Sequence, residues 1–279
     1  AVTAIKGFDR DLKCRGYQYA PGQTHTHDGE VRVGRSGFHA IPGNPLEVFC
    51  YYAPGVSRFY RVDLSGDLAR SDDDVEIAGR VIRLAEDEMT IADIVAAAVE
   101  WLSKDGACSA SATSNWSVVG TTDGRNVISA TGNWSVAAAT GYHCATSATG
   151  DFSVAIVAGD QSAALVAGCH SAAIATGHQS AASATGYQNI AGVTVCEGAS
   201  SVSGDCSVAV AAGDYSYSCA LSTTSCAVAS GLRSTVDGVE GAAICAVERD
   251  HAGRIVSVAS GIVGRDGIRP KVRYRCVGG

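Results

Sequence analysis

A nine-residue pattern from residue 105 to residue 248 constrains the fold of this chain more than any other feature. This stretch divides into sixteen nonapeptides without an insertion, and their consensus is G-x-x-S-x-A-x-A-T. Glycine fills the first position in ten repeats, and serine fills the fourth position in ten. A short fixed period in unbroken register predicts a solenoid, in which each unit packs on its neighbours rather than around a globular core.

The pattern inside each repeat predicts a short strand followed by a tight turn. Small residues at the fourth, sixth and eighth positions alternate with a period of two, which is typical of a β-strand. Glycine at the repeat boundary favours a turn that other residues would resist.

The third position of the repeat indicates how many nonapeptides complete one coil. Trp116, Trp134, Phe152 and His170 occupy it in alternate repeats, eighteen residues apart. Alternate repeats therefore form one set, as expected when eighteen residues make a coil of two strands and two turns. The four side chains should stack along one edge at about 4.8 Å, and sixteen repeats should give about eight coils in a rod of roughly 40 Å.

Charged residues are scarce in the repeats. Residues 105–248 contain ten acidic residues, two arginines and no lysine, so the broad faces should present mainly Ala, Val, Ser and Thr. Large uncharged faces usually indicate that a partner covers them. We therefore expect a homo-oligomer formed by lateral or threefold association, a trimer in the second case. The alternative is a monomer whose faces are coated with Ser and Thr.

The composition divides the chain into three parts and predicts a mainly β protein. Residues 1–104 are expected to form a small α+β domain that ends in a capping helix. Residues 105–248 are expected to form the β-solenoid. Residues 249–279 break the period and regain Arg and Lys, which indicates a C-terminal β cap over an open sheet edge.

Four segments of the first part predict its elements. Residues 57–66 and 78–86 carry β-branched and aromatic side chains in near alternation and predict strands. Asn44 followed by a proline predicts the start of a short helix. The pair Thr90 and Asp93 opens a helical pattern over residues 90–104.

Charge and cysteine usage exclude several classes of partner. The formal net charge is −7 and no basic stripe occurs, so a nucleic-acid partner is not expected. No run of eighteen apolar residues and no charged-then-apolar leader occurs, so neither a membrane partner nor a secretory signal is expected. The eleven cysteines include no CxxC pair, which favours free thiols in a reducing compartment over a disulfide framework or a zinc site.

The predicted edge of Trp116, Trp134, Phe152 and His170 is the candidate binding surface. Stacked exposed aromatic side chains suit a glycan. The alternative is a structural ladder that shields the strand ends and fixes the coil register.

Metal sites and catalytic motifs are not predicted. His25 and His27 share one face of a strand beside Asp28, but no third ligand is identifiable. Calcium-binding nonapeptides place Asp at the sixth position, where this chain has chiefly Ala. No nucleophile elbow, P-loop or GxGxxG occurs, so no catalytic residue and no cofactor is predicted. Cys219 and Cys226 lie on neighbouring predicted strands, either facing each other or, as we favour, as free thiols.

Two resemblances concern the repeats and the whole chain. The run SVAIVAGDQSAALVAG resembles the repeats of trimeric autotransporter adhesin heads, whose Ser/Ala/Gly-rich strands build left-handed trimeric rolls. Over nearly its whole length the chain is similar to uncharacterised phage and prophage proteins, in IKGFDRDLKCRGYQY, in GFHAIPGNPLEVFCYY, in the nonapeptides and in SGIVGRDGIRP. The second resemblance implies a phage-encoded product and brings no established activity.

A third resemblance concerns residues 1–104 alone. The order of YAPGQ, GFHA, a helix and RFYRVDLSGDL is similar to that of compact ADP-ribosyltransferase domains. This resemblance implies His39, Arg15 and Tyr52 as candidate residues, whereas no acidic residue of the chain follows the motif of that family.

We therefore predict a non-enzymatic, phage-type structural or attachment protein, such as a virion decoration, fibre or tail-associated component. Its expected partners are other copies of itself, other phage or host proteins and a glycan. The alternative is a phage-encoded intracellular effector or host-defence inhibitor, with an ADP-ribosyltransferase-like N-terminal domain as the enzyme variant. The expected location is the virion, or the host cytoplasm if the protein is not packaged.

Overall fold

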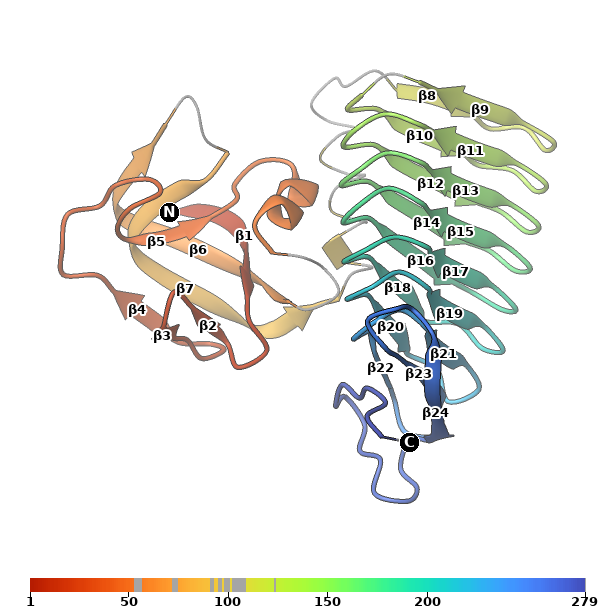
Figure 1. Cartoon of the computed structure of the whole chain (residues 1–279). Helices are drawn as coiled ribbons and strands as arrows, with labels where there is room; N and C mark the ends of the chain where they lie inside the picture. Colours follow the sequence, from red (N-terminus) through yellow and green to blue (C-terminus); the bar gives the residue numbers. More distant parts are fainter. Residues whose placement is uncertain are drawn as a thin grey trace.

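The computed structural model describes residues 1–52, 57–71, 75–90, 93–94, 97, 101, 109–122 and 124–278. Within them the chain forms an N-terminal antiparallel sheet, a β-solenoid and a C-terminal segment that closes the solenoid (Figure 1). The predicted mainly β architecture is therefore confirmed. No helix in these ranges is long and apolar enough to cross a membrane.

The N-terminal sheet is built on one long hairpin. Its strand order is β1-β6-β7-β4, and β5 also pairs with β7. The two strands predicted at 57–66 and 78–86 are confirmed as β6 and β7, and each is longer than expected, at thirteen residues. The strands of this part are β1 (Val2–Phe8), β2 (Lys13–Cys14), β3 (Tyr17–Gln18), β4 (Thr24–Thr26), β5 (Phe38–Ala40), β6 (Arg58–Arg70) and β7 (Ile77–Met89).

The predicted short helix begins where expected. Asn44 caps it by accepting a hydrogen bond from the Leu46 amide at 3.1 Å, and the segment Pro45–Cys50 is a 3-10 helix, η1. The segment is therefore about two turns of 3-10 helix rather than an α-helix.

Only part of the predicted capping helix falls in the described residues. The side chains and amides of Thr90 and Asp93 bond reciprocally, as the capping pattern predicts. Positions 93, 94, 97 and 101 are helical, and the other positions of 91–104 lie outside the described residues. Trp101 packs on Val127 and Ala145, so this residue contacts the side of the solenoid rather than its end.

The solenoid consists of two parallel sheets whose strands alternate along the chain. Neighbouring strands in each sheet are eighteen residues apart, as in the pairing of Val136 with Val154. One sheet contains β8 (Ser109–Ala112), β10 (Val127–Ala130), β12 (Ala145–Thr149), β14 (Ala163–Ala167), β16 (Ala181–Thr185), β18 (Ala199–Val202), β20 (Tyr217–Ala220) and β22 (Thr235–Gly238). The other contains β9 (Val118–Thr121), β11 (Val136–Ala139), β13 (Val154–Val157), β15 (Ala172–Ala175), β17 (Ile190–Val193), β19 (Val208–Ala211), β21 (Cys226–Ala229), β23 (Ala243–Arg249) and β24 (Ile255–Ile262).

The unbroken period predicted up to residue 248 is wrong in the last coil. Cys226 pairs with Ala243, which is only seventeen residues later. The turn before β23 is one residue shorter, and Gly241 takes the left-handed conformation in it, with φ at 88°. The one-residue deletion therefore occurs in the turn and leaves the strand register intact.

The interior of the solenoid is thin and filled by small side chains. The inward residues are almost all Ala and Val, and Ala155, Val157 and Ala164 are fully buried. The serines of the fourth position are buried at the turns, where the Ser153 hydroxyl donates to Gly132 O and the Ser153 amide donates to Ser171 Oγ. This pattern recurs in successive coils and satisfies backbone groups that would otherwise be buried without partners.

The turns assign different roles to glycine and to the third residue. Thirteen third-position residues, from Trp116 to Arg233, have φ between 52° and 64°, the left-handed region. Glycine at the first position is needed instead because the coils approach closely: a Cβ on Gly159 would lie 1.8 Å from Gly141 O. The repeat-boundary glycines therefore set the coil spacing, and the left-handed residue is the variable one.

The C-terminal segment closes both sheets, as predicted for a cap. Strand β24 runs antiparallel to β23 and pairs Ala259 with Ala246. The backbone of Tyr274 exchanges two hydrogen bonds with Val236 of β22, at 2.7 and 2.8 Å. The last strand of each parallel sheet therefore has a partner, and β24 forms the edge of the nine-stranded sheet at this end.

The N-terminal domain covers the outer face of the eight-stranded sheet, which we call the covered face. Ala163, Ala181 and Ala199 point outward from this sheet and are fully buried in one cluster with Leu46 and Phe49 of η1. Figure 1 shows the two parts side by side.

The outer face of the nine-stranded sheet carries no such layer in the described residues, and we call it the open face. It consists of two columns of outward residues, which alternate with the buried interior positions. The columns are Val118, Val136, Val154, Ala172, Ile190, Val208, Cys226 and Ala243, and Gly120, Ala138, Ile156, Ile174, Gly192, Val210, Val228 and Cys245.

Candidate functional site

The aromatic edge has the stacked geometry that the repeat spacing predicts. Ring centroids of Trp116 and Trp134 are 5.0 Å apart, those of Trp134 and Phe152 4.3 Å, and those of Phe152 and His170 4.8 Å. The ring planes deviate from parallel by 5° to 9°. The stacking prediction is confirmed, whereas a binding role of these residues stays a prediction.

The stack limits how this edge can contact a ligand. Each ring between the two ends has a neighbouring ring against both of its faces, so it presents its rim outward. Trp116 ends the stack and is 72% exposed, compared with 47% for Trp134. A sugar that stacks on a ring face would therefore use Trp116, and the remaining rings would contribute edge contacts.

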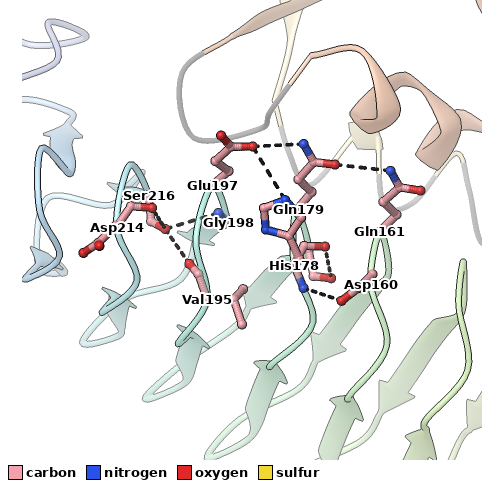
Figure 2. Close-up of polar contacts among 10 residues, drawn as sticks. Asp160, Gln161, His178, Gln179, Val195, Glu197, Gly198, Asp214 and Ser216 are labelled. Carbon is pink, nitrogen blue, oxygen red and sulfur yellow. Dashed lines mark hydrogen bonds and ion pairs between the residues drawn. The ribbon is translucent and has the colours of Figure 1, made fainter.

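The opposite edge forms a polar ladder instead (Figure 2). Gln161 Nε2 donates to Gln179 Oε1 at 3.2 Å, and Gln179 Nε2 donates to Glu197 Oε2 at 2.9 Å. At the other end, Gln161 Oε1 accepts from the Tyr142 hydroxyl and lies 2.6 Å from His143 Nε2. Because that oxygen is an acceptor, His143 carries its proton on Nε2. His143 and His170 therefore lie on different edges.

The polar ladder predicts a specific acid sensitivity. Burial lowers the pKa of His143, so the unfolded chain binds this proton more readily than the folded protein. His143 therefore stabilises the fold above its ordinary pKa of about 6.5 and loses that contribution as the pH falls below it. His143→Gln keeps a donor to Gln161, and we expect its melting temperature to fall by a few degrees less than that of the wild type between pH 7 and pH 5. His251→Gln, in an exposed turn, is the control; equal acid sensitivity of all three proteins would contradict the prediction.

A cavity of about 870 Å³ in the N-terminal domain brings together the residues implied by the ADP-ribosyltransferase resemblance. Arg15, His39 and Tyr52 all line it. Lys6, which belongs to no catalytic sequence motif, lies among them with 2% of its surface exposed. Its Nζ donates to His39 O at 2.8 Å and lies 3.4 Å from the Tyr52 hydroxyl.

A thiol completes this cluster. Cys14 Sγ lies 3.6 Å from Lys6 Nζ and 3.0 Å from the Tyr52 hydroxyl. Burial and Lys6 lower the pKa of His39, whose Nε2 accepts from the Gly34 amide at 2.8 Å. His39 is therefore held as a neutral imidazole. The cavity thus contains an amine, a thiol, a phenol and an imidazole within one small volume.

One signal in the sequence would have found Lys6. In β1, Ala4, Lys6 and Phe8 alternate along one face, and Ala4 and Phe8 belong to the core of the N-terminal sheet. A lysine in such an inward row indicates either a buried partner or a site.

Both histidines of the pair lie beside Phe38, with ring centroids 6.5 Å (His25) and 6.3 Å (His27) from its ring. His25 lies in β4, where its Nδ1 is 3.3 Å from the Tyr17 hydroxyl, whereas His27 lines the cavity. Among the residues that the structure describes, no three His, Cys, Asp or Glu side chains are gathered as for a metal ion. Asp151 and Asp160 accept hydrogen bonds from the amides of the next coil, Cys169 and His178.

Cys219 and Cys226 do not form a disulfide. Cys219 lies on the covered face and Cys226 on the open face, so they do not face each other, and both thiols are free.

A cleft of about 610 Å³ lies where the two domains and the C-terminal segment meet. There Arg273 lies 4.0 Å from the Tyr217 ring centroid, and the Tyr217 hydroxyl donates to Asp237 at 2.7 Å. Arg273 also donates to Ser57 O, so this cluster joins the parts of the chain.

The architecture defines a β-solenoid protein with an N-terminal antiparallel domain packed against one face of the solenoid. Residues 2–97 match a family described as a domain of unknown function, DUF7666, which covers the N-terminal domain and not the repeats. No curated protein and no solved structure matches the chain. These comparisons do not bear on the resemblances to phage proteins, adhesin heads or ADP-ribosyltransferases, which stay predictions.

Proposed function

We propose that the protein is a non-enzymatic structural or attachment component, whose rod holds surfaces at fixed distances and assembles through its open face. The observation that carries this proposal is the composition of the open face. Its two columns contain no charged, Ser, Thr, Asn or Gln side chain. Contiguous apolar faces of this kind on a folded protein are typical of interfaces.

The covered face is more polar than the open face, which supports the open face as the interface. Its outward positions include serines, and Ser147, Ser183 and Ser201 are buried under the N-terminal domain. The chain therefore covers the more polar of its two broad faces and leaves the more apolar one in solvent. Val118 and Ile190 of the open face are 78% and 52% exposed.

The occupant that fits the open face best is a second copy of this chain. The face is flat and carries β-branched residues in straight rows, which suits face-to-face sheet packing at a separation of about 10 Å. Eight strands of four residues span roughly 40 by 13 Å, or about 520 Å², which is about two thirds of the roughly 800 Å² that each partner contributes to a standard interface. A twofold pair covers both faces with one contact. A trimer would need two different surfaces.

A charge in the middle of the open face tests this assembly. We expect the wild type to be a dimer and Val154→Asp to weaken the dimer by at least about 100-fold, because an unpaired carboxylate would be buried in an apolar contact. Sedimentation equilibrium over a concentration series measures the change.

Gln188→Asp places the same charge on the aromatic edge and is the matched control, which should leave the dimer intact. Circular dichroism verifies that both variants are folded. A monomeric wild type, or equal weakening by both variants, would overturn the assembly.

On the basis of the resemblance to phage proteins, we propose that the protein acts as part of the virion. A decoration, fibre or tail-associated component would be recovered with purified particles, and its absence from them would overturn the virion role. The aromatic edge would then face outward and contact a glycan through Trp116.

A second candidate function is favoured by the cavity around Lys6. An intracellular effector with an ADP-ribosyltransferase-like domain would use Arg15, His39 and Tyr52, which this cavity brings together. Incubation of the full chain with NAD⁺ tests it: release of nicotinamide would support the enzyme variant, and the lack of both turnover and binding would end it.

A further inference from the structure

Lys6 has unused hydrogen-bonding capacity in an apolar setting. An ammonium group has three donors, and Nζ has one hydrogen bond of ordinary length, to His39 O. Its contacts with the Tyr52 hydroxyl and Cys14 Sγ are long. Among the described residues, no carboxylate forms an ion pair with it.

Burial makes the neutral form of the Lys6 amine more accessible than that of a surface lysine. Nζ lies 5.5 to 5.8 Å from the ring centroids of Phe8, Tyr19 and Tyr52. Burial among them is the largest influence and lowers the pKa of Lys6, while Cys14 and Glu76 act in the opposite direction. A desolvated lysine of this kind is the usual form of a nucleophilic amine.

The same cavity offers cations for a negatively charged group. Its lining contains four basic residues, Lys6, Lys13, Arg15 and Arg35, and three acidic ones, Asp9, Asp28 and Glu76. The Arg15 guanidinium donates to Gly34 O at 3.2 Å, and neither arginine forms an ion pair with a described carboxylate. Guanidinium groups suit the bidentate binding of a phosphate or carboxylate.

We propose that this cavity binds a small carbonyl compound that carries an anionic group, with Lys6 as the amine that attacks the carbonyl carbon. The arginines hold the anionic group, and Tyr19 and Tyr52 pack against the carbon skeleton. This site goes beyond the structural role and does not depend on it.

The step is an ordinary imine formation. The neutral Nζ adds to the carbonyl carbon and forms a C–N bond, and the oxygen leaves as water after accepting two protons, both of which come from the amine nitrogen in the overall balance. The Tyr52 hydroxyl, 3.4 Å from Nζ, is placed to relay a proton. No oxidant or cofactor is required, and water reverses the reaction.

Pyridoxal 5′-phosphate is a suitable probe because it combines an aldehyde, an aromatic ring and a phosphate. The full chain is incubated with it near neutral pH, reduced with borohydride and digested, and the modified peptides are identified by mass spectrometry. The chain has only four lysines, at positions 6, 13, 104 and 271, so each can be followed. We expect Lys6 to react at least about tenfold faster than Lys13 and Lys271, as its lowered pKa implies.

Variants separate the two parts of the site. Lys6→Met, which keeps the length and removes the amine, should abolish the fast adduct, whereas Lys271→Arg, which lies outside this cavity, should retain it. Arg35→Gln should slow the reaction of pyridoxal 5′-phosphate and leave that of pyridoxal, which lacks the phosphate, unchanged. Equal labelling of all lysines, or labelling of Lys6 only after unfolding in urea, would overturn the proposal. An unchanged phosphate preference in Arg35→Gln would overturn the anion site.

Discussion

Gly159→Ala is expected to lower the free energy of unfolding by about 3 kcal/mol, near the upper end of overpacking effects. The added Cβ would lie 1.8 Å from Gly141 O and 2.5 Å from its carbonyl carbon. Both are backbone atoms of the preceding coil, which cannot move aside unless the coils separate and the strand hydrogen bonds on either side lengthen. Urea denaturation followed by circular dichroism measures the loss.

Gly192→Ala is the matched control for this substitution. Gly192 lies in β17 with negative φ, and a Cβ there would meet nothing within 4 Å. Alanine in a strand restricts the unfolded chain more than glycine does, so this variant should be neutral or slightly stabilising. A similar loss of unfolding free energy in both variants would mean that close coil spacing is not the reason why glycine recurs every nine residues in this chain.

Removal of residues 250–279 is expected to convert the protein into a species that grows end to end. The deletion strips β24 from β23 and Tyr274 from Val236, which leaves two adjacent parallel sheets with free edges. Free edges of flat strands pair readily with other chains. The inward residue Val263 is lost as well, so the last coil is also destabilised. Light scattering over time and electron microscopy would detect the polymer.

A shorter deletion distinguishes edge exposure from loss of the tail itself. Removal of 277–279 takes away the hydrogen bond from the Gly278 amide to Glu248 but leaves β24 and Tyr274 in place. This protein should stay dispersed under conditions in which the longer deletion polymerises. Polymerisation of both, or of neither, would contradict the capping role.

The repeat region was the most predictable part of the molecule because its period determines its geometry. The interval between Trp116 and Trp134 is enough to place one ring on the other, since strand spacing leaves no other arrangement for a coil of eighteen residues. The short final coil was not predictable from the consensus. Gly241 is the second residue of its nonapeptide, but in the structure it has the left-handed conformation of a third residue.

The relation between the domains could not be read from the pattern. Both broad faces carry small residues, and only the packing of η1 on Ala163 and Ala181 reveals which of them the chain covers. The cavity was equally hidden, because Lys6, Cys14, His39 and Tyr52 come from four separate segments. The three residues suggested by resemblance do meet there, but the amine between them was visible only as a lysine in an apolar row.

The left-handed third residue of each turn makes surface chemistry and scaffold independent of one another. Its backbone conformation is the same for Trp134, Gln161, Glu197 and Cys206, and its side chain lies at the turn, outside the cluster of Ala and Val that fills the interior. A mutation there changes one side chain in a row spaced at about 4.8 Å and leaves the strands of the two sheets unchanged. Such a molecule can acquire new specificities, or be engineered to do so, one rung at a time.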